Sequence, residues 1–472
     1  MSEPMPQASA GNMPAPRGAD AVARWEETRL RRRIMHGQHS PDVAGRILSA
    51  VGGERAGKWG DPDLTCNLLS ASASALSALY ATRGTVVADE AQGMAKLELA
   101  LLESGFWAMM PRVQRDVIGM REHFLRPYIN SRGEQRLRRV WADMVEAEST
   151  LDDPEQPARL CELRQRVFEG NRIWTWEEMD IRDESKPIWR VWDQERRTDL
   201  SKHFLEKKDG SPAPEGGLIG DAYDCRDPNN GDRPLMPYVC YHAERTGQLW
   251  DANSWKEVVD GTLSISMMWT FFVHGLKNAS WPQRWMAGGK VLSANSAGEV
   301  IVDPAVLLRF SSLVDGTPIQ VGHFEPGCDP KSLHDAIASY ERRVAALAGL
   351  NAADVQRVSG DPRSGYALAV TRSGQREAQR RFQPVFEASD AVLLKVISSL
   401  NGIKGTGARI RYGAIPKSLD EMRADLEYIE RMRAQGLMTQ RQAVEHSHPD
   451  WTKDEVDRHL ADIEKENAAA AA

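Results

Sequence analysis

Residues 261–273 form an uncharged, largely apolar run of thirteen, flanked by Asp260 and His274. A helix that spans a membrane needs about 20 apolar residues, so this run is too short for that role. Its middle, ISMMWTFFV, is apolar on nearly every face of a helix. Such a helix must be covered on all sides, either by its own fold or by adjacent subunits.

The run lies inside a longer predicted helix, residues 254–279. This helix opens at Ser254 and Glu257, which have the spacing of a capping box. In that motif the hydroxyl and the carboxylate satisfy each other's free backbone amides.

A second helix is predicted over residues 330–349. Asp329 suits the N-terminal cap, Pro330 suits the first helical position, and Gly349 suits a left-handed C-terminal stop. Its apolar residues, in steps of four, three, four and three, are Leu333, Ile337, Tyr340, Val344 and Leu347. Those steps make a seam that can pack along another helix.

Residues 280–329 join these two helices and are interrupted by glycine and proline. KVLSANSAGEVIVD predicts a hairpin, and TPIQVGHF predicts another strand. The sequence therefore predicts a small β-containing module inserted between two helices that can pair antiparallel.

The N-terminal half is predicted to mix helices and strands. Helical patterns occur at residues 20–34 and 68–82 and, within residues 93–169, in EQRLRRVWADMVEAES and QPARLCELRQRVFEG. The Trp- and Ile-rich alternation of residues 172–193 favours strands instead, and PLMPYVCYHAE predicts one more.

The C-terminal part is predicted to be mostly helical. A long helix covers about residues 375–401, where Pro384 should either kink the helix or mark its real start. GIKGTGARIRYGAIP predicts a glycine-rich turn followed by a strand. Capping boxes beginning at Thr439 and Thr452 open further helices.

The size and composition are those of a multidomain globular protein. The chain has 472 residues, and single cores tend to split beyond roughly 250–300 residues, so two to four regions are expected. Residues 1–19, rich in Pro, Ala and Gly, predict a disordered arm without a secretory signal. Together these patterns predict an α+β fold that is mainly helical.

Charge and cysteine usage limit the function. The formal net charge of -7 argues against a protein that grips nucleic acid by general electrostatics, because such binding is driven by a basic surplus. The five cysteines are widely spaced and form no C-x-x-C pair, which favours free thiols in a reducing cytoplasm.

Enzyme motifs are absent from the sequence. It contains no P-loop, no G-x-S-x-G and no H-E-x-x-H, and GIKGTG is too short for a dinucleotide fingerprint. The histidines that could bind a metal, but that we predict to lie on the surface, are His36, His39, His446 and His448. The carboxylates that could suggest a two-metal nuclease, but that we predict to lie in a solvated loop, are Glu177, Glu178, Asp180, Asp183 and Glu184. The 14 tryptophans indicate core and interface packing rather than base stacking.

The order of elements and three stretches carry a resemblance to a known family. The first stretch is a loop followed by a long helix, SGDPRSGYALAVTRSGQREAQRRFQPVFEASDAVLLKVISSL. The second is a strand, a proline, a helix and a G-[hydroxyl]-x-x-x-A ending, RIRYGAIPKSLDEMRADLEYIERMRAQGLMTQRQAVEH. The third is an acidic final helix, HPDWTKDEVDRHLADIEKEN. From about Asp251 to Asn467, the chain resembles the portal proteins of tailed bacteriophages, the siphophage-type head-to-tail connectors.

The resemblance implies a portal fold. Its parts would be a wing at 20–253, stem helices at 254–279 and 330–349, a clip at 280–329, a tunnel loop at 350–374, a long wing helix and strand at 375–415, and a crown with a C-terminal tail at 416–472. The tunnel loop would ring the DNA with Asp354, Gln356, Arg357, Asp361 and Arg363. The subunit interface would contain Trp269, Phe271, Phe272, Leu333, Ile337 and Tyr340.

The resemblance also implies how the protein acts. The family forms a ring, usually a dodecamer, at one capsid vertex, and double-stranded DNA passes through it during packaging and ejection. The implied partners are the large terminase, the head–tail adaptor and the major capsid protein. The protein would be assembled in the host cytoplasm and reside in the virion. No catalytic residue, metal, cofactor or membrane is expected.

Two other classes of protein remain as alternatives. One is a different virion structural protein, such as a neck or minor capsid protein, although an adaptor is usually much shorter. The other, less favoured, is a metal-dependent nuclease.

Overall fold

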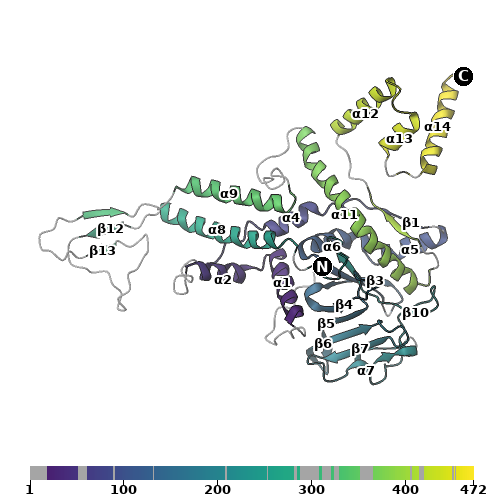
Figure 1. The fold of residues 1–472 in the computed structure, drawn as a ribbon, viewed down its shortest axis with the longest axis horizontal. Helices are drawn as coiled ribbons and strands as arrows, with labels where there is room; N and C mark the ends of the chain where they lie inside the picture. Colours follow the sequence, from purple (N-terminus) through teal and green to yellow (C-terminus); the bar gives the residue numbers. More distant parts are fainter. Residues whose placement is uncertain are drawn as a thin grey trace. The chain divides into compact units, whose positions relative to one another are not determined.

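The structure of the protein is a computed structural model. It describes residues 19–51, 61–88, 91–130, 132–207, 210–251, 254–280, 284–287, 308–310, 320–323, 329–350, 365–403, 407–413, 419–448, 451 and 453–471. Figure 1 shows a mixture of helices and small sheets, which confirms the α+β class. The chain divides into two compact units. The sheet unit comprises residues 1–29, 73–254 and 356–472, and the helix-pair unit comprises residues 30–72 and 255–355.

The sheet unit contains two larger antiparallel sheets. One has the order β4-β5-β6-β7-β8, with β4 Val145–Glu148, β5 Arg159–Phe168, β6 Asn171–Asp180, β7 Ile188–Asp193 and β8 Leu218–Ile219. The other has the order β11-β2-β3, with β11 Val239–His242, β2 Glu122–Ile129 and β3 Gln135–Trp141. The strands predicted in residues 172–193 and in PLMPYVCYHAE are thus confirmed as β6, β7 and β11. β5 and β6 meet at Glu169 and Gly170, both at positive φ, which matches the twist of a tight hairpin.

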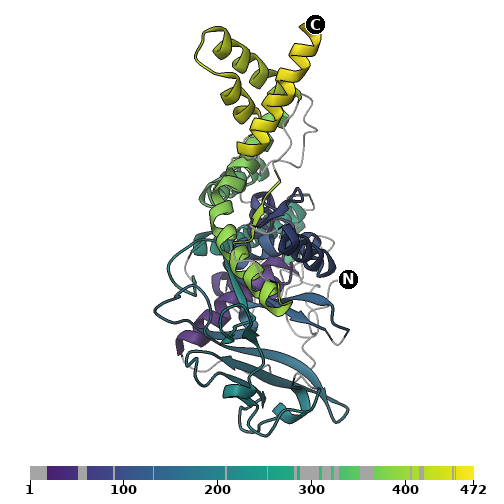
Figure 2. The ribbon, with the colours of Figure 1, turned by 90° about the vertical axis from the view of Figure 1, so that its right-hand side faces the viewer.

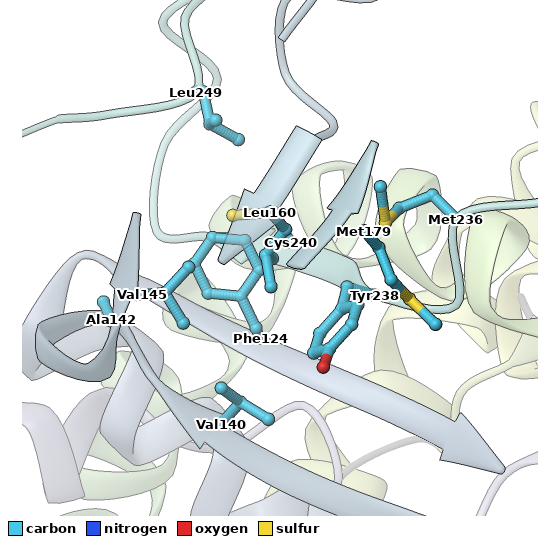
Figure 3. Packing of buried hydrophobic residues seen from close by; sticks show 10 residues of the cluster. All are labelled: Phe124, Val140, Ala142, Val145, Leu160, Met179, Met236, Tyr238, Cys240 and Leu249. Atoms are coloured by element: carbon cyan, nitrogen blue, oxygen red, sulfur yellow. The ribbon is translucent and has the colours of Figure 1, made fainter. Parts of the chain in front are cut away.

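The core of this unit lies between the two sheets (Figure 3). Phe124 from β2 and Val140 from β3 pack with Leu160 from β5 and Met179 from β6. Cys240 from β11 completes the contact, and all five side chains are buried. Burying one such side chain contributes about 1.5–3 kcal/mol, so this cluster holds the two sheets together.

The remaining regular elements of the sheet unit are shorter or helical. The helices are α5 Ala91–Glu103, α6 Phe106–Met120, α7 Ser201–Phe204, α11 Gly365–Leu400 and the single turns Ala142–Met144 and Gly220–Ala222. The short strand pairs are β1 Thr85–Val87 with β15 Arg409–Arg411, and β9 Arg226–Asp227 with β10 Arg233–Pro234. α1 Ala19–Met35 and α4 Leu68–Leu76 each contain a boundary between the units.

Helix α11 packs on β11 and β2 and is fixed there by one carboxylate. Asp390 accepts hydrogen bonds from the hydroxyls of Tyr80, Tyr241 and Tyr412, each at 2.7 Å. All four side chains are buried. Three donors meet one acceptor group, which satisfies the polar atoms that this core would otherwise leave unpaired.

Two segments that we predicted to be helical are strands. EQRLRRVWADMVEAES forms β3, a single helical turn and β4, and QPARLCELRQRVFEG forms β5. Their Leu, Glu, Arg and Gln residues favour helices in isolation, but tertiary pairing overrides that preference. Glu162, for example, is buried on β5, where it meets Arg138 from β3.

The long helix also differs from its predicted start. α11 begins at Gly365 rather than near Gln375, so it occupies part of the segment expected to be a loop. Pro384 lies inside the helix and does not mark its beginning. A proline removes only one backbone hydrogen bond, and the apolar side chains Phe382 and Phe386 around it are buried.

The C-terminal segment forms three helices, visible in olive and yellow in Figure 2. They are α12 Leu419–Ala434, α13 Gln440–Ser447 and α14 Lys453–Ala471. The capping box predicted at Thr439 is confirmed, because its hydroxyl accepts from the amide of Gln442 and the Gln442 side chain accepts in return from the Thr439 amide.

The helix-pair unit contains α2 Ser40–Val51, α8 Lys256–Ser280, α9 Pro330–Leu347, β12 Arg284–Ala287, β13 Leu308–Phe310 and β14 Gln320–His323. β12 pairs parallel with β13 and antiparallel with β14. The strand predicted in TPIQVGHF is therefore confirmed, whereas the hairpin KVLSANSAGEVIVD lies outside the described residues. α8 starts at Lys256, two residues after the predicted Ser254, whose hydroxyl donates to Asp251.

The described helices include none that is both long enough and apolar enough to span a membrane.

Candidate functional site

The helix pair α8–α9 is the candidate site, and its side chains fix how the two helices run. Early in α8, Gly261 lies against Val344 near the end of α9. Further along α8, the indole Nε1 of Trp269 donates to Glu341 at 2.6 Å, and its ring lies 5.9 Å from that of His334. The partner numbers fall as the α8 numbers rise. The helices are therefore antiparallel, as Figure 1 also shows.

Gly261 permits a close approach of the two helices. A Cβ atom built on Gly261 would come within 2.7 Å of both methyl carbons of Val344, which real side chains essentially never do. Val344 is buried, as are Val258 and Ile265 near Gly261 on α8. The contact thus depends on the absence of a side chain at this one position of the apolar run.

The residues predicted to form a subunit interface divide between the inside and the edge of this pair. Ile337 is already buried within the chain. The side chains that are half-buried are Trp269, Phe271, Phe272, Leu333 and Tyr340. Trp269 and Phe272 also contact each other edge to face, with ring centres 5.2 Å apart. Their placement between subunits stays a prediction.

Two apolar residues next to this cluster remain open to solvent in the single chain. Val273 is 50% exposed and Leu276 is 37% exposed. They lie three residues apart on α8, so they share one face of the helix. Our reading of the sequence missed Leu276 because the uncharged run ends before His274, although its helical spacing from Val273 was visible.

Cys66 contacts the α8–α9 helix pair, and its thiol is not reactive. Its thiol donates to the Glu341 carboxylate at 3.1 Å. Burial and the hydrogen bond to Glu341 raise the pKa of Cys66, which keeps the sulfur protonated. Since the thiolate is the nucleophile, this cysteine acts as a packing and hydrogen-bonding group.

The predicted tunnel-loop residues cannot be placed. Asp354, Gln356, Arg357, Asp361 and Arg363 all lie outside the described residues.

The sheet unit contains one cysteine–histidine pair that sequence inspection missed. The Sγ of Cys240 lies 3.4 Å from the Nε2 of His242, and Glu122 pairs with His242 across the strands. Burial raises the pKa of Cys240 well above its usual value and lowers the pKa of His242. Both shifts favour a neutral thiol and a neutral imidazole. With Cys240 wholly buried, the pair does not have the properties of a nucleophilic site.

Three of the five carboxylates that could have suggested a nuclease lie on a strand, so the prediction of a solvated loop was wrong for these three. Glu177, Glu178 and Asp180 lie on β6, and Glu177 is 2% exposed. The side chains around Glu177 are those of Arg126, Arg164, Arg166 and Trp189. Asp183 and Glu184 do lie exposed in the following turn. The three carboxylates on the strand are thus each paired with arginine, Glu178 with Arg159 and Asp180 with Arg182.

The histidines that could have suggested a metal site differ in their exposure to solvent. His39 is fully buried, contrary to the prediction of a surface residue, and burial lowers its pKa. His446 is exposed, and His448 stacks on Trp451 at 3.9 Å. Within the described ranges, no group of three or more His, Cys, Asp or Glu side chains has an arrangement that could hold a metal ion.

Comparison with known proteins gives only distant likenesses. No family model matches the chain, and no curated protein matches it. Among solved structures, a chain from the neck of an empty GTA particle computed with C6 symmetry is 12% identical, with a TM-score of 0.45. A chain from the neck of a native GTA particle computed with C12 symmetry is 10% identical, with a TM-score of 0.41. Each comparison covers 81% of this chain and 89% of the other. Neither likeness is close enough to assign a family.

Proposed function

We propose that this chain is a portal protein of a tailed phage, a structural subunit that forms a ring at one capsid vertex. The observation that carries the proposal is the antiparallel pair α8–α9. One side of this pair is buried within the chain, whereas Val273 and Leu276 are exposed. Along the sequence, strands β12–β14 lie between α8 and α9. An apolar helix face of this kind is covered by another subunit when identical chains close into a ring.

In this function α8 and α9 are the stem helices, and residues 280–329 are the clip that docks the large terminase and the head–tail adaptor. Residues 350–364 belong to the tunnel loop around the DNA. The major capsid protein surrounds the ring in the virion, and twelve subunits are the expected number. The protein needs no catalytic residue for this role.

The negative net charge of the chain favours a channel through which DNA moves over a surface that binds DNA tightly. Each phosphate that a basic group neutralises adds to affinity, so a strongly basic channel would hold the duplex and slow its movement. A chain with a formal net charge of -7 avoids that hindrance.

Substitution of Val273 tests the proposal. Val273→Asp places a charge on the face that would contact the next subunit, where burial without a partner is costly. We expect each contact between subunits to weaken by about tenfold or more, equivalent to about 1.4 kcal/mol. Because this loss is repeated at every contact of a ring, the fraction of chains in rings should fall sharply. Native mass spectrometry and negative-stain microscopy would measure this.

Val167→Asp is the matched control, because Val167 is 64% exposed and lies in the other unit, at the β5–β6 hairpin. It should leave ring formation unchanged. If Val273→Asp assembles as well as Val167→Asp and the unchanged protein, α8 is not an interface helix and the proposal fails.

A further inference from the structure

An arginine cluster in the sheet unit holds more positive than negative charge. It contains Arg126 and Arg138 from the smaller sheet, Arg164 and Arg166 from β5, and the carboxylates of Glu162 and Glu177. Four guanidinium groups against two carboxylates leave a net charge of +2. Such a surplus, partly removed from water, favours the approach of a further anion.

Arg164 is the most exposed arginine of the cluster, and so the one that an anion from outside can reach. The Arg138 guanidinium binds Glu162 through two nitrogens, at 2.6 and 2.5 Å, and Arg166 binds Glu177 at 2.5 Å. The Nε of Arg166 is nevertheless buried without a hydrogen-bond partner. The side chain of Arg164 is 35% exposed and contacts Glu177 at 3.2 Å through one nitrogen only. Burial lowers the pKa of Arg166 against the raising effect of Glu177, and the charges of Arg164 and Arg126 add to the lowering.

A complementary surface lies at the other end of the same strand. Residues 151–154, Leu-Asp-Asp-Pro, form an exposed acidic turn before β5, in which Leu151 is 100% exposed. From Arg159, where β5 begins, to Arg164 the strand extends about 16 Å at about 3.3 Å per residue. This rigid strand separates the acidic turn from the cluster of its own chain.

We propose that the arginine cluster binds the acidic turn, Asp152 and Asp153, of a second copy of this chain. This inference rests on the proposed ring. A ring of identical subunits needs two different, complementary surfaces on every chain, and these two satisfy that need by charge. Duplex DNA fits less well, because a duplex presents a track of phosphates, whereas Arg164 is the only arginine of the four that is more than a quarter exposed.

Charge exchange between the two surfaces tests the pairing. Asp152→Arg/Asp153→Arg changes only exposed side chains, so its folding is not at risk. Arg164→Glu makes the reciprocal change, and Arg164→Gln is a milder second variant should Glu disturb the cluster. We expect each to lower the ring fraction by about tenfold at low salt and the three changes Asp152→Arg, Asp153→Arg and Arg164→Glu combined to restore it. Arg172→Glu, an exposed residue on β6 outside the cluster, is the matched control and should assemble normally.

The possible failures are distinguishable. If the unchanged protein forms rings and all the variants do too, or if the combined variant does not recover, the pairing is wrong while the ring stands. If the unchanged protein forms no rings, the proposed function itself fails. If the unchanged protein binds a short DNA duplex, and Arg164→Gln loses that binding while keeping its rings, the cluster is a phosphate site and the pairing is wrong.

Discussion

Asp390 is a single buried residue whose protonation makes the stability of the folded state depend on pH. Burial raises its pKa from 3.8 to about 6, against the lowering effect of the hydrogen bonds from Tyr412, Tyr241 and Tyr80. Nearby Glu387 adds to the rise. The folded pKa lies above the unfolded one, so the folded state binds this proton more tightly. The resulting stability is complete below about pH 4 and is lost as the pH rises to about 6.

Replacing Asp390 with Asn removes this dependence, because the amide cannot ionise. Relative to the unchanged protein, the free energy of unfolding of Asp390→Asn should rise by up to about 3 kcal/mol between about pH 4 and pH 7. Urea unfolding at the two pH values would measure the difference. Glu377→Gln, which removes an exposed carboxylate from the same helix, should follow the unchanged protein. Parallel pH profiles for Asp390→Asn and the unchanged protein would show that Asp390 does not titrate in this range.

At the scale of elements, sequence patterns predicted the helices better than the first strands. The bounds of α8 and α9 lie within two residues of those predicted, because caps, a proline and helical spacing all agree. β3, β4 and β5 were mistaken for helices. On a half-buried strand the inward residues are usually apolar, but β5 turns Glu162 and Arg164 toward charges on other strands. The alternation of Arg164 and Arg166 was a usable signal, because their partner Glu177 lies on the next strand. The sequence did not show that Arg126, from the other sheet, also pairs with Glu177.

The same limit applies to the candidate site. Sequence patterns could identify an apolar helix and a seam on its partner. They could not show that Trp269 donates to Glu341 within the chain, or that Val273 and Leu276 stay exposed. These facts depend on the rotation of each helix about its axis, which spacing alone does not determine to within one residue.

The packing of α8 on α9 gives a test with an internal control, because α8 contains two glycines in different surroundings. Gly261→Ala should destabilise the protein by about 1–3 kcal/mol, since the new methyl group meets Val344 and the helices must move apart. Gly275→Ala meets nothing within 4 Å and should stabilise it by about 0.5–1 kcal/mol through helix propensity. Thermal or urea unfolding would measure both. A stabilising Gly261→Ala would contradict the close contact of the two helices.

At the scale of the whole molecule, we propose that this chain is one part of an assembly. Val273 and Leu276 are apolar yet exposed, the arginine cluster holds more arginines than carboxylates, and the acidic turn is exposed. A ring of identical subunits would supply a counterpart for each of these surfaces at once, whereas a two-fold dimer would repeat the same surface on both sides. The number of subunits then follows from the rotation between neighbours.

The most direct measurement is the assembly state of the purified, unmodified chain, by native mass spectrometry together with electron microscopy. We expect a closed ring of identical subunits with rotational symmetry and a central opening that admits duplex DNA. Twelve copies are the expected number, and another closed ring would change only that number. A monomer at all concentrations, a two-fold dimer or an open filament would contradict the central claim that this protein is a channel-forming subunit.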